Sequence, residues 1–111
     1  MPGPHGMDAV FHALAHDTRR SMLRRLAGGE LTVGELAEPL AISLAAASKH
    51  VRVLERAGLV RRHRHGRENT LELSAEPLRD VARWISGYER FWNARLDRLE
   101  KFFAAKQEKS K

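Results

Sequence analysis

The sequence predicts a mainly α-helical fold with one small β-hairpin, and three observations support this prediction. Apolar residues recur at intervals of three and four through most of the chain, as in amphipathic helices. Residues 60–73 differ, because a short alternating arm follows a glycine there. The 111 residues include no cysteine, so the fold uses neither a disulfide nor a thiolate metal site. We expect one domain over residues 8–105, between flexible ends at 1–7 and 106–111.

The first two helices are predicted from their caps and their apolar spacing. Asp8 is expected to cap a helix over residues 9–15. The second helix begins at Asp17 or Thr18 and ends at Gly28-Gly29. Its inward face is expected to consist of Met22, Leu23 and Leu26. Its arginines are expected to face outward, namely Arg19, Arg20, Arg24 and Arg25.

The next two helices form a helix-turn-helix by pattern. Thr32 caps the third helix with Glu35 as its capping-box partner, and Pro39 ends it. Ser43 caps the fourth helix, which stops at Gly58. The buried face of this fourth helix is expected to be Leu44, Ala47, Val51 and Leu54. Its opposite face is expected to consist of small, polar and basic side chains, namely Ala45, Ser48, Lys49 and Arg52. Such a face suits a helix in the major groove of DNA.

A basic hairpin is predicted directly after the fourth helix. Leu71 and Leu73 alternate with polar residues in its second arm, and Gly66 supplies the turn. Three arginines are expected near its tip, at positions 62, 64 and 67. A basic hairpin in this position is typical of a wing that reaches phosphates or the minor groove. An ordinary exposed hairpin is the alternative.

The last helix is predicted over residues 76–105, a length of ~45 Å at ~1.5 Å per residue. Its apolar stripe is Leu78, Val81, Ile85, Tyr88, Trp92, Leu96, Leu99 and Phe103, widened by Trp84, Phe91 and Phe102. A helix this long overhangs a small domain, so its aromatic residues need a partner, and a second copy is the simplest one. The expected dimer interface is Val10, Phe11, Leu14, Trp84, Tyr88, Phe91, Trp92, Leu96, Leu99 and Phe103. The alternative is that the stripe is entirely intrachain core.

Positive charge is concentrated in one block of the chain. Residues 41–67 hold seven basic residues against Glu55 alone, and this net charge of +6 equals that of the whole chain. Such a concentration indicates a nucleic-acid footprint more than a solvated surface. No apolar run is long enough for a signal peptide or a membrane span, so we expect a cytoplasmic protein without a membrane partner.

Together these elements predict a winged helix-turn-helix with the order ααααββα, assembled as a homodimer. Over residues 7–103 the chain resembles the ArsR/SmtB family of winged-helix transcriptional regulators. The resemblance is carried by FHALA (11–15), DTRR (17–20), LTVGELA (31–37) and, most specifically, SLAAASKHVRVLERAGLV (43–60). The aromatic segment YERFW (88–92) is similar to the branch that lacks metal ligands. One departure is His16-Asp17, where the family commonly has an aspartate-proline pair.

The resemblance implies a dimeric repressor that binds an imperfect inverted repeat. It implies DNA contacts for Ser43, Ser48 and His50, with Lys49 and the wing arginines on the DNA backbone. The residues expected to contact DNA are therefore Ser43, Ala45, Ala46, Ser48, Lys49, His50, Arg52, Arg62, His63, Arg64, His65 and Arg67. Activation instead of repression stays open, because it depends on where the operator lies.

Metal sensing is the main alternative function, since many members of this family bind metals. The family's cysteine positions hold Thr32 and Gly34 here, and no histidine follows His65, so both family sites are absent. The remaining candidates are His5, His12 and His16, assisted by Asp8 or Asp17. His12 and His16 are four apart and share a face if one helix includes both. A nickel- or zinc-responsive regulator would use these histidines, whereas the favoured reading needs no cofactor.

Two other classes of protein are less favoured. An enzyme would need a nucleophile, a phosphate loop or an acidic pair in an apolar setting, and the sequence has none of these. An architectural protein that coats DNA would need the basic block but not the small polar face of the fourth helix. Affinity for one operator against random duplex separates these readings.

Overall fold

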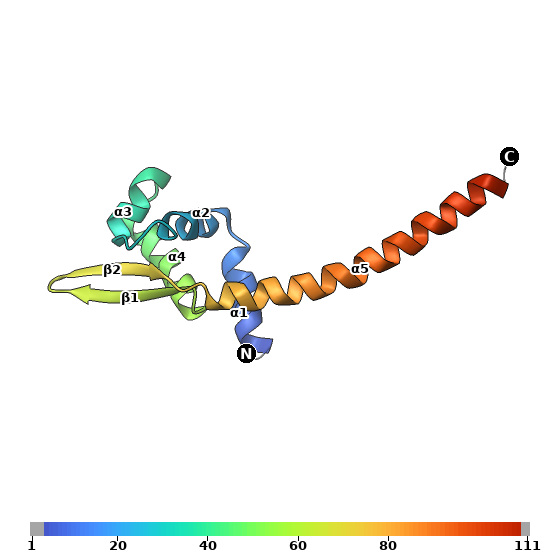
Figure 1. Ribbon diagram of the computed structural model, residues 1–111. Coiled ribbons are helices and arrows are strands. Elements are labelled where there is room, and N and C mark those ends of the chain that lie inside the picture. Colours follow the sequence, from blue (N-terminus) through green and yellow to red (C-terminus); the bar gives the residue numbers. More distant parts are fainter. Residues whose placement is uncertain (1–3, 110–111) are drawn as a thin grey trace. The chain divides into compact units, whose positions relative to one another are not determined.

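The computed structural model describes residues 4–109, and the side chains of residues 6–106, as a mainly helical chain with one hairpin (Figure 1). It divides into two compact units, residues 4–81 and 82–109. The elements are α1 (Pro4–Leu14), α2 (Asp17–Leu26), α3 (Val33–Ala37), the 3₁₀ helix η1 (Glu38–Leu40), α4 (Leu44–Arg56), β1 (Val60–His65), β2 (Glu68–Leu73) and α5 (Glu76–Lys109). This order confirms the predicted winged helix-turn-helix.

Both ends of the helical region extend further than the sequence predicted. Helix α1 begins at Pro4, so Asp8 lies inside it, and residues 4–7, expected to precede the helix, are helical. Helix α5 continues through Lys109, beyond the predicted end near residue 105. Residues 1–3 and 110–111 lie outside the described part of the chain.

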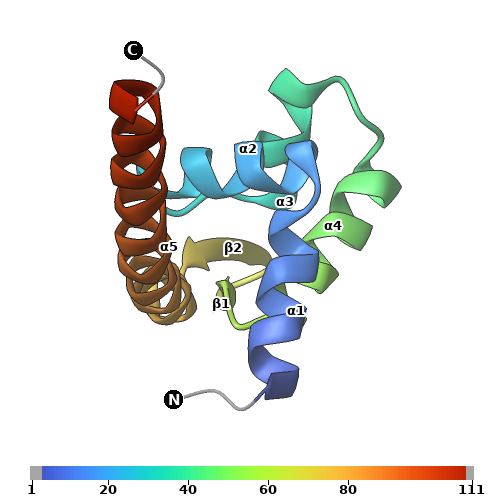
Figure 2. The same ribbon diagram turned by 90° about the vertical axis from the view of Figure 1, so that its right-hand side faces the viewer.

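The core of the first unit lies between α1, α2, α3, α4 and the hairpin (Figure 2). Its largest fully buried side chains are Met22, Leu36, Leu54, Leu59, Leu71, Val10 and Val51. The predicted inward face of α2 and most of that of α4 are thereby confirmed. Two predictions are wrong. Leu44 is 60% exposed, because the first turn of α4 extends beyond the core, and Val10 is 1% exposed in the core of its own chain and cannot contact a second one.

Arg19 is the one buried charged residue of the described core, at 8% exposure, although we expected it to face outward. Its Nε donates to the carbonyl oxygen of Ala13 at 2.8 Å, and its Nη2 donates to that of His12 at 2.9 Å. These carbonyls lie in the last turn of α1, where partners within the helix run out, and that of His12 also accepts from the Ala15 N–H at 3.3 Å. Arg19 therefore caps α1 from α2, which explains how a guanidinium is tolerated inside the core.

The helix-turn-helix has the predicted caps. The Thr32 hydroxyl accepts from the Glu35 backbone N–H at 3.1 Å, and the Glu35 carboxylate accepts from the Thr32 N–H at 2.9 Å. Pro39 lies in the first turn of η1, and Ala41 follows in the left-handed conformation with φ 52°. That residue reverses the chain into Ser43, whose Oγ accepts from the Ala46 N–H at 3.1 Å.

The hairpin pairs β1 and β2 antiparallel, with Val60 opposite Leu73 and His65 opposite Glu68. Two residues form the turn, and Gly66 has φ +63°, which a glycine adopts without strain. Leu31 forms an isolated antiparallel β-bridge beside β2, since its N–H and carbonyl both bond to Leu71. The second arm of the hairpin is thus held on both sides.

Helix α5 carries a long row of exposed apolar side chains. Beyond the buried Val81, large apolar residues from position 84 to 103 are about half exposed. Stacked and edge-to-face pairs such as Trp84–Tyr88 and Phe91–Trp92 run along the helix. Among the described residues, no helix is both long and apolar enough to cross a membrane.

Candidate nucleic-acid interface

The outward face of α4 combines small and basic side chains. Ala45, Lys49 and Arg52 are exposed, and Ala46 and Ser48 are half-buried beside them. Ala47 and Val51 lie on the opposite, buried face. Ser43 uses its hydroxyl as the N-cap, so its Oγ is already engaged with the helix backbone. The helix thus presents a surface that another backbone can approach closely.

Leu44 adds an exposed apolar group at the start of this face. Sequence periodicity assigned it to the core because it lies three residues before Ala47. The signal against that assignment was its position at the first turn after the cap, where a helix has not yet reached the core. Apolar side chains of this kind contact thymine methyl groups in major grooves.

His50 is part of a partly buried contact that ties α4 to α2. Its Nδ1 lies 3.3 Å from Nη1 of Arg19, and its ring is 4.5 Å from that of His16. Because arginine only donates, Nδ1 of His50 accepts and the ring proton lies on Nε2. Burial lowers the pKa of His50, and His16, Arg19 and Lys49 lower it further. At neutral pH this ring therefore offers a neutral donor in a fixed orientation.

The wing arginines have different surroundings. Arg67 lies in the turn, and Arg64 lies one residue from the end of β1, where its Nε donates to the Gly66 carbonyl at 3.1 Å. We expected Arg62 near the tip of the wing, but it lies further back in β1, opposite Leu71. Its Nη2 donates to Glu55 of α4 at 2.8 Å, and this hydrogen bond raises the pKa of the arginine further. Arg62 thus joins the base of the wing to α4.

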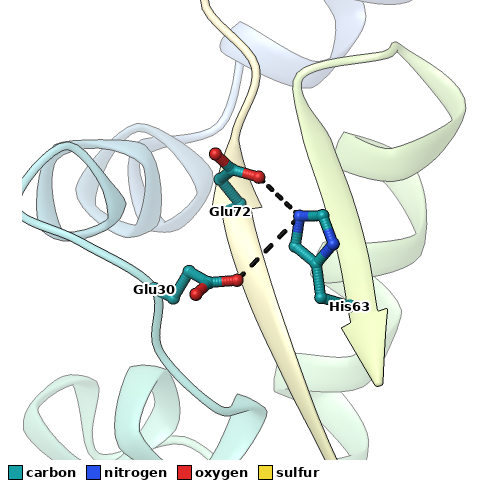
Figure 3. A group of neighbouring side chains, drawn as sticks. All are labelled: Glu30, His63 and Glu72. Carbon is teal, nitrogen blue, oxygen red and sulfur yellow. Dashed lines mark hydrogen bonds and ion pairs between the residues drawn. The ribbon is translucent and has the colours of Figure 1, made fainter. Parts of the chain in front are cut away.

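His63 and His65 share one face of the wing with Glu72, while Arg62 and Arg64 lie on the other. This follows from the two-residue period of a strand and the pairing of Arg61 with Glu72. Nε2 of His63 lies 2.5 Å from Glu72 and 3.9 Å from Glu30 (Figure 3). The two histidines therefore have acidic neighbours within the protein, which the sequence did not indicate.

The N-terminal histidines do not form the shared helical face that a metal site would need. Helix α1 ends at Leu14, and His16 instead caps α2, where its Nδ1 accepts from the Thr18 N–H at 3.2 Å. His12 lies on α1 and His16 lies beyond its end, so their four-residue spacing does not place the two imidazoles on one helical face. The side chain of His5 lies outside the described residues. Within the described chain, the group with close metal-ligand atoms is Glu30, His63 and Glu72.

Comparison with known proteins decides which family this geometry represents. A family model described as a helix-turn-helix domain matches residues 14–63. The transcriptional repressor SdpR of Bacillus subtilis is 34% identical over 82 residues, which cover 74% of this chain and 91% of SdpR. The chain belongs to the ArsR family of winged helix-turn-helix transcriptional regulators.

Solved structures agree with the ArsR assignment. The crystal structure of the ArsR family transcriptional regulator RHA00566 superposes with a TM-score of 0.76 at 37% identity, over 83% of this chain and 95% of that one. The homodimeric winged helix-turn-helix domain of Mb0332 from Mycobacterium bovis gives 0.62 at 29% identity, over 83% and 82%. The protein is accordingly a DNA-binding transcriptional regulator and not an enzyme.

Proposed function

We propose that this ArsR-family protein is a dimeric repressor that reads an inverted-repeat operator with α4 and flanks it with the wing. The observation that carries the proposal is the composition of the outward face of α4. Ala45 and Ser48 are small enough for a close approach, and Lys49 and Arg52 supply positive charge beside them. The similarity to the repressor SdpR supports repression as the outcome of binding.

The proposed dimer uses α5, together with Phe11 and Leu14 of α1. Exposed side chains such as Trp92, Leu96 and Leu99 form an apolar row much longer than the scattered apolar residues normal for a monomer surface. The homodimeric relative Mb0332 supports the same assembly here. A dimer spaces two α4 helices for successive major grooves, about 34 Å apart on one side of the duplex. A dimer bound at a promoter then blocks RNA polymerase. The proposed site of action is the cytoplasm.

The division of labour between α4 and the wing gives the test. Ser48→Ala is expected to relax sequence choice, because Ser48 faces the bases. Arg64→Ala is expected to weaken binding to all sequences and to lower the salt slope by about one unit, because it removes one phosphate contact. Fluorescence anisotropy with operator and random duplexes over a range of salt concentrations measures both quantities.

The operator itself comes from footprinting on the DNA upstream of the gene and from selection among genomic fragments. Wild-type protein is expected to bind the operator about 10³-fold or more tighter than random duplex. Equal affinity for both would leave an architectural role and would contradict the proposal. An Arg64→Ala variant that changes sequence preference alone would contradict the assignment of the wing.

The dimer is tested separately by sedimentation. Trp92→Ala combined with Leu96→Ala removes two half-exposed side chains of the row without touching the core of the first unit. The variant is expected to sediment as a monomer where the wild type sediments as a dimer. Arg90→Ala, which replaces an exposed side chain of the same helix, provides the control. A dimer that persists unchanged in the double variant would place the interface elsewhere.

A further inference from the structure

Three separate segments bring acidic and imidazole groups together at the base of the wing. Because Leu31 pairs antiparallel with Leu71, Glu30 lies beside Glu72 across the two strands. His63 approaches both carboxylates from β1, on the other side of β2 (Figure 3). Like charges on neighbouring strands repel each other, so this placement costs stability. The Thr70 hydroxyl donates to Glu30 at 3.2 Å, and His63 lies between the two carboxylates, where a cation would offset their charge more fully.

The ligand atoms are already close to the spacing that a metal ion requires. One atom each from Glu30, His63 and Glu72 lies within 4.8 Å of the others. Nε2 of His65 lies 3.8 Å from the same oxygen of Glu30 that faces His63. In the ion pairs described for Glu30 and Glu72, the partner of each carboxylate is a histidine and not an arginine or lysine.

We infer that Glu30, His63 and Glu72 bind a divalent transition-metal ion of the zinc class, with His65 at the edge of the site. Imidazole nitrogen and carboxylate oxygen ligate Zn²⁺ at about 2.0–2.2 Å, so small side-chain rotations suffice to close the site. Two carboxylates balance the charge of a divalent ion when the imidazoles are neutral. The three side chains are 40–51% exposed, so an ion reaches them from solution. Three protein ligands leave a fourth position for water.

Such an ion would fix the wing to the segment between α2 and α3. Glu30 lies between Gly29 and the capped start of α3, whereas His63 and Glu72 belong to the hairpin. The clamp therefore holds the base of the wing against the body of the first unit. A consequence for DNA affinity rests on the proposed function, because it requires that the wing contact DNA. The ion site itself does not depend on that function.

The site is tested by titrating the DNA-free wild-type protein with Zn²⁺ by calorimetry and with Co²⁺ by visible absorption. Saturation at one ion per chain, with the intense absorption of four-coordinate Co²⁺, is expected. Glu30→Gln and His63→Gln are expected to weaken binding by at least about tenfold, the loss seen for disturbed metal sites. His12→Gln serves as the control, since this exposed histidine lies on α1.

The outcomes of this titration are distinct. Loss of binding in Glu30→Gln and His63→Gln, with His12→Gln unchanged, supports the site. No saturable binding by the wild type, or equal binding by the Glu30→Gln and His63→Gln variants, overturns it and leaves the contacts of His63 with Glu30 and Glu72 as contacts within the protein alone. Loss in His12→Gln overturns it in favour of the N-terminal histidines. Circular dichroism of each variant verifies folding, and since no DNA is present, failure here leaves the proposed repressor function untouched.

Discussion

The buried guanidinium of Arg19 predicts a large difference between two neighbouring arginines. Both donate to carbonyls in the last turn of α1, Arg19 to His12 and Ala13, and Arg20 to Leu14 at 2.7 Å. Arg19 is buried, whereas the side chain of Arg20 is 46% exposed. Water can replace the exposed contact of Arg20, whereas the bond from Arg19 to Ala13 is buried and that to His12 is partly buried. Arg19→Ala and Arg20→Ala therefore form a matched pair.

The expected magnitudes follow from these contacts. Arg19→Ala removes two hydrogen bonds from a charged donor at about 1.5 kcal/mol each, so it is expected to cost about 2–3 kcal/mol. The Ala13 carbonyl loses a buried partner, while the His12 carbonyl keeps the Ala15 N–H at 3.3 Å. Arg20→Ala loses an exposed bond and an ion pair to Asp17 at 3.6 Å, worth together less than about 1 kcal/mol. Urea denaturation followed by circular dichroism measures both free energies of unfolding. All variants are compared at one protein concentration, because dimerisation contributes to stability.

The refuting result is equally specific. If the two variants differ by less than about 0.5 kcal/mol, Arg19 does not cap α1 in the folded protein, because an exposed arginine gives effects of that size. A smaller dependence of the unfolding free energy on urea concentration would instead indicate a change in the denatured state. The urea midpoint alone would then not measure the difference in stability.

Three further predictions concern a cap, a titration and an ion pair. Thr32→Ala is expected to destabilise the protein by about 0.5–2 kcal/mol in thermal or urea unfolding, while Glu35→Gln, which keeps the capping box, changes little. Because the pKa of His50 is lowered on folding from its ordinary 6.5, the unfolded chain binds the proton more tightly. The stability contributed by neutral His50 is thus complete above pH 6.5 and is lost as the pH falls below it, and His50→Gln is expected to reduce this slope. A double-mutant cycle of Arg62→Ala and Glu55→Ala is expected to give a coupling of at most about 1 kcal/mol, since both side chains are partly exposed; a larger value would contradict that screening.

The features that sequence predicted well are those specified by local chemistry. The capping box of Thr32 and Glu35, the cap at Ser43 and the turn at Gly66 depend on residues a few positions apart, and all are present. Periodicity likewise identified the buried face of α2, including Met22 and Leu23. Element ends were less predictable, because α1 continues from Pro4 through residues whose composition favours a turn.

The errors lie where a residue's surroundings are set by distant parts of the chain. The helical pattern predicts Arg19 on the outside because arginine is polar. It does not show that the carbonyls at the end of α1 accept hydrogen bonds from this side chain. Glu30 and Glu72 are 42 positions apart in the sequence and meet only because Leu31 pairs with Leu71. The alternation of His63 and His65 was visible in the sequence, but their acidic partners were not.

Arg19 also links α1, which is proposed for the dimer, to His50 on the proposed DNA-reading helix α4. Its Nε and Nη2 hold the last turn of α1, and its Nη1 lies against Nδ1 of His50 in α4. One side chain thus fixes both the helix that carries Phe11, proposed for the dimer, and the ring that the ArsR resemblance assigns to DNA contact. Because the guanidinium is planar and rigid, a shift at the end of α1 must move His50 or break a buried hydrogen bond. Replacing Arg19 with lysine would keep the charge but lose this geometry, so Arg19→Lys is expected to weaken operator binding even where the helices remain folded. Unchanged operator affinity in folded Arg19→Lys, measured by anisotropy, would show that the orientation of His50 does not depend on Arg19.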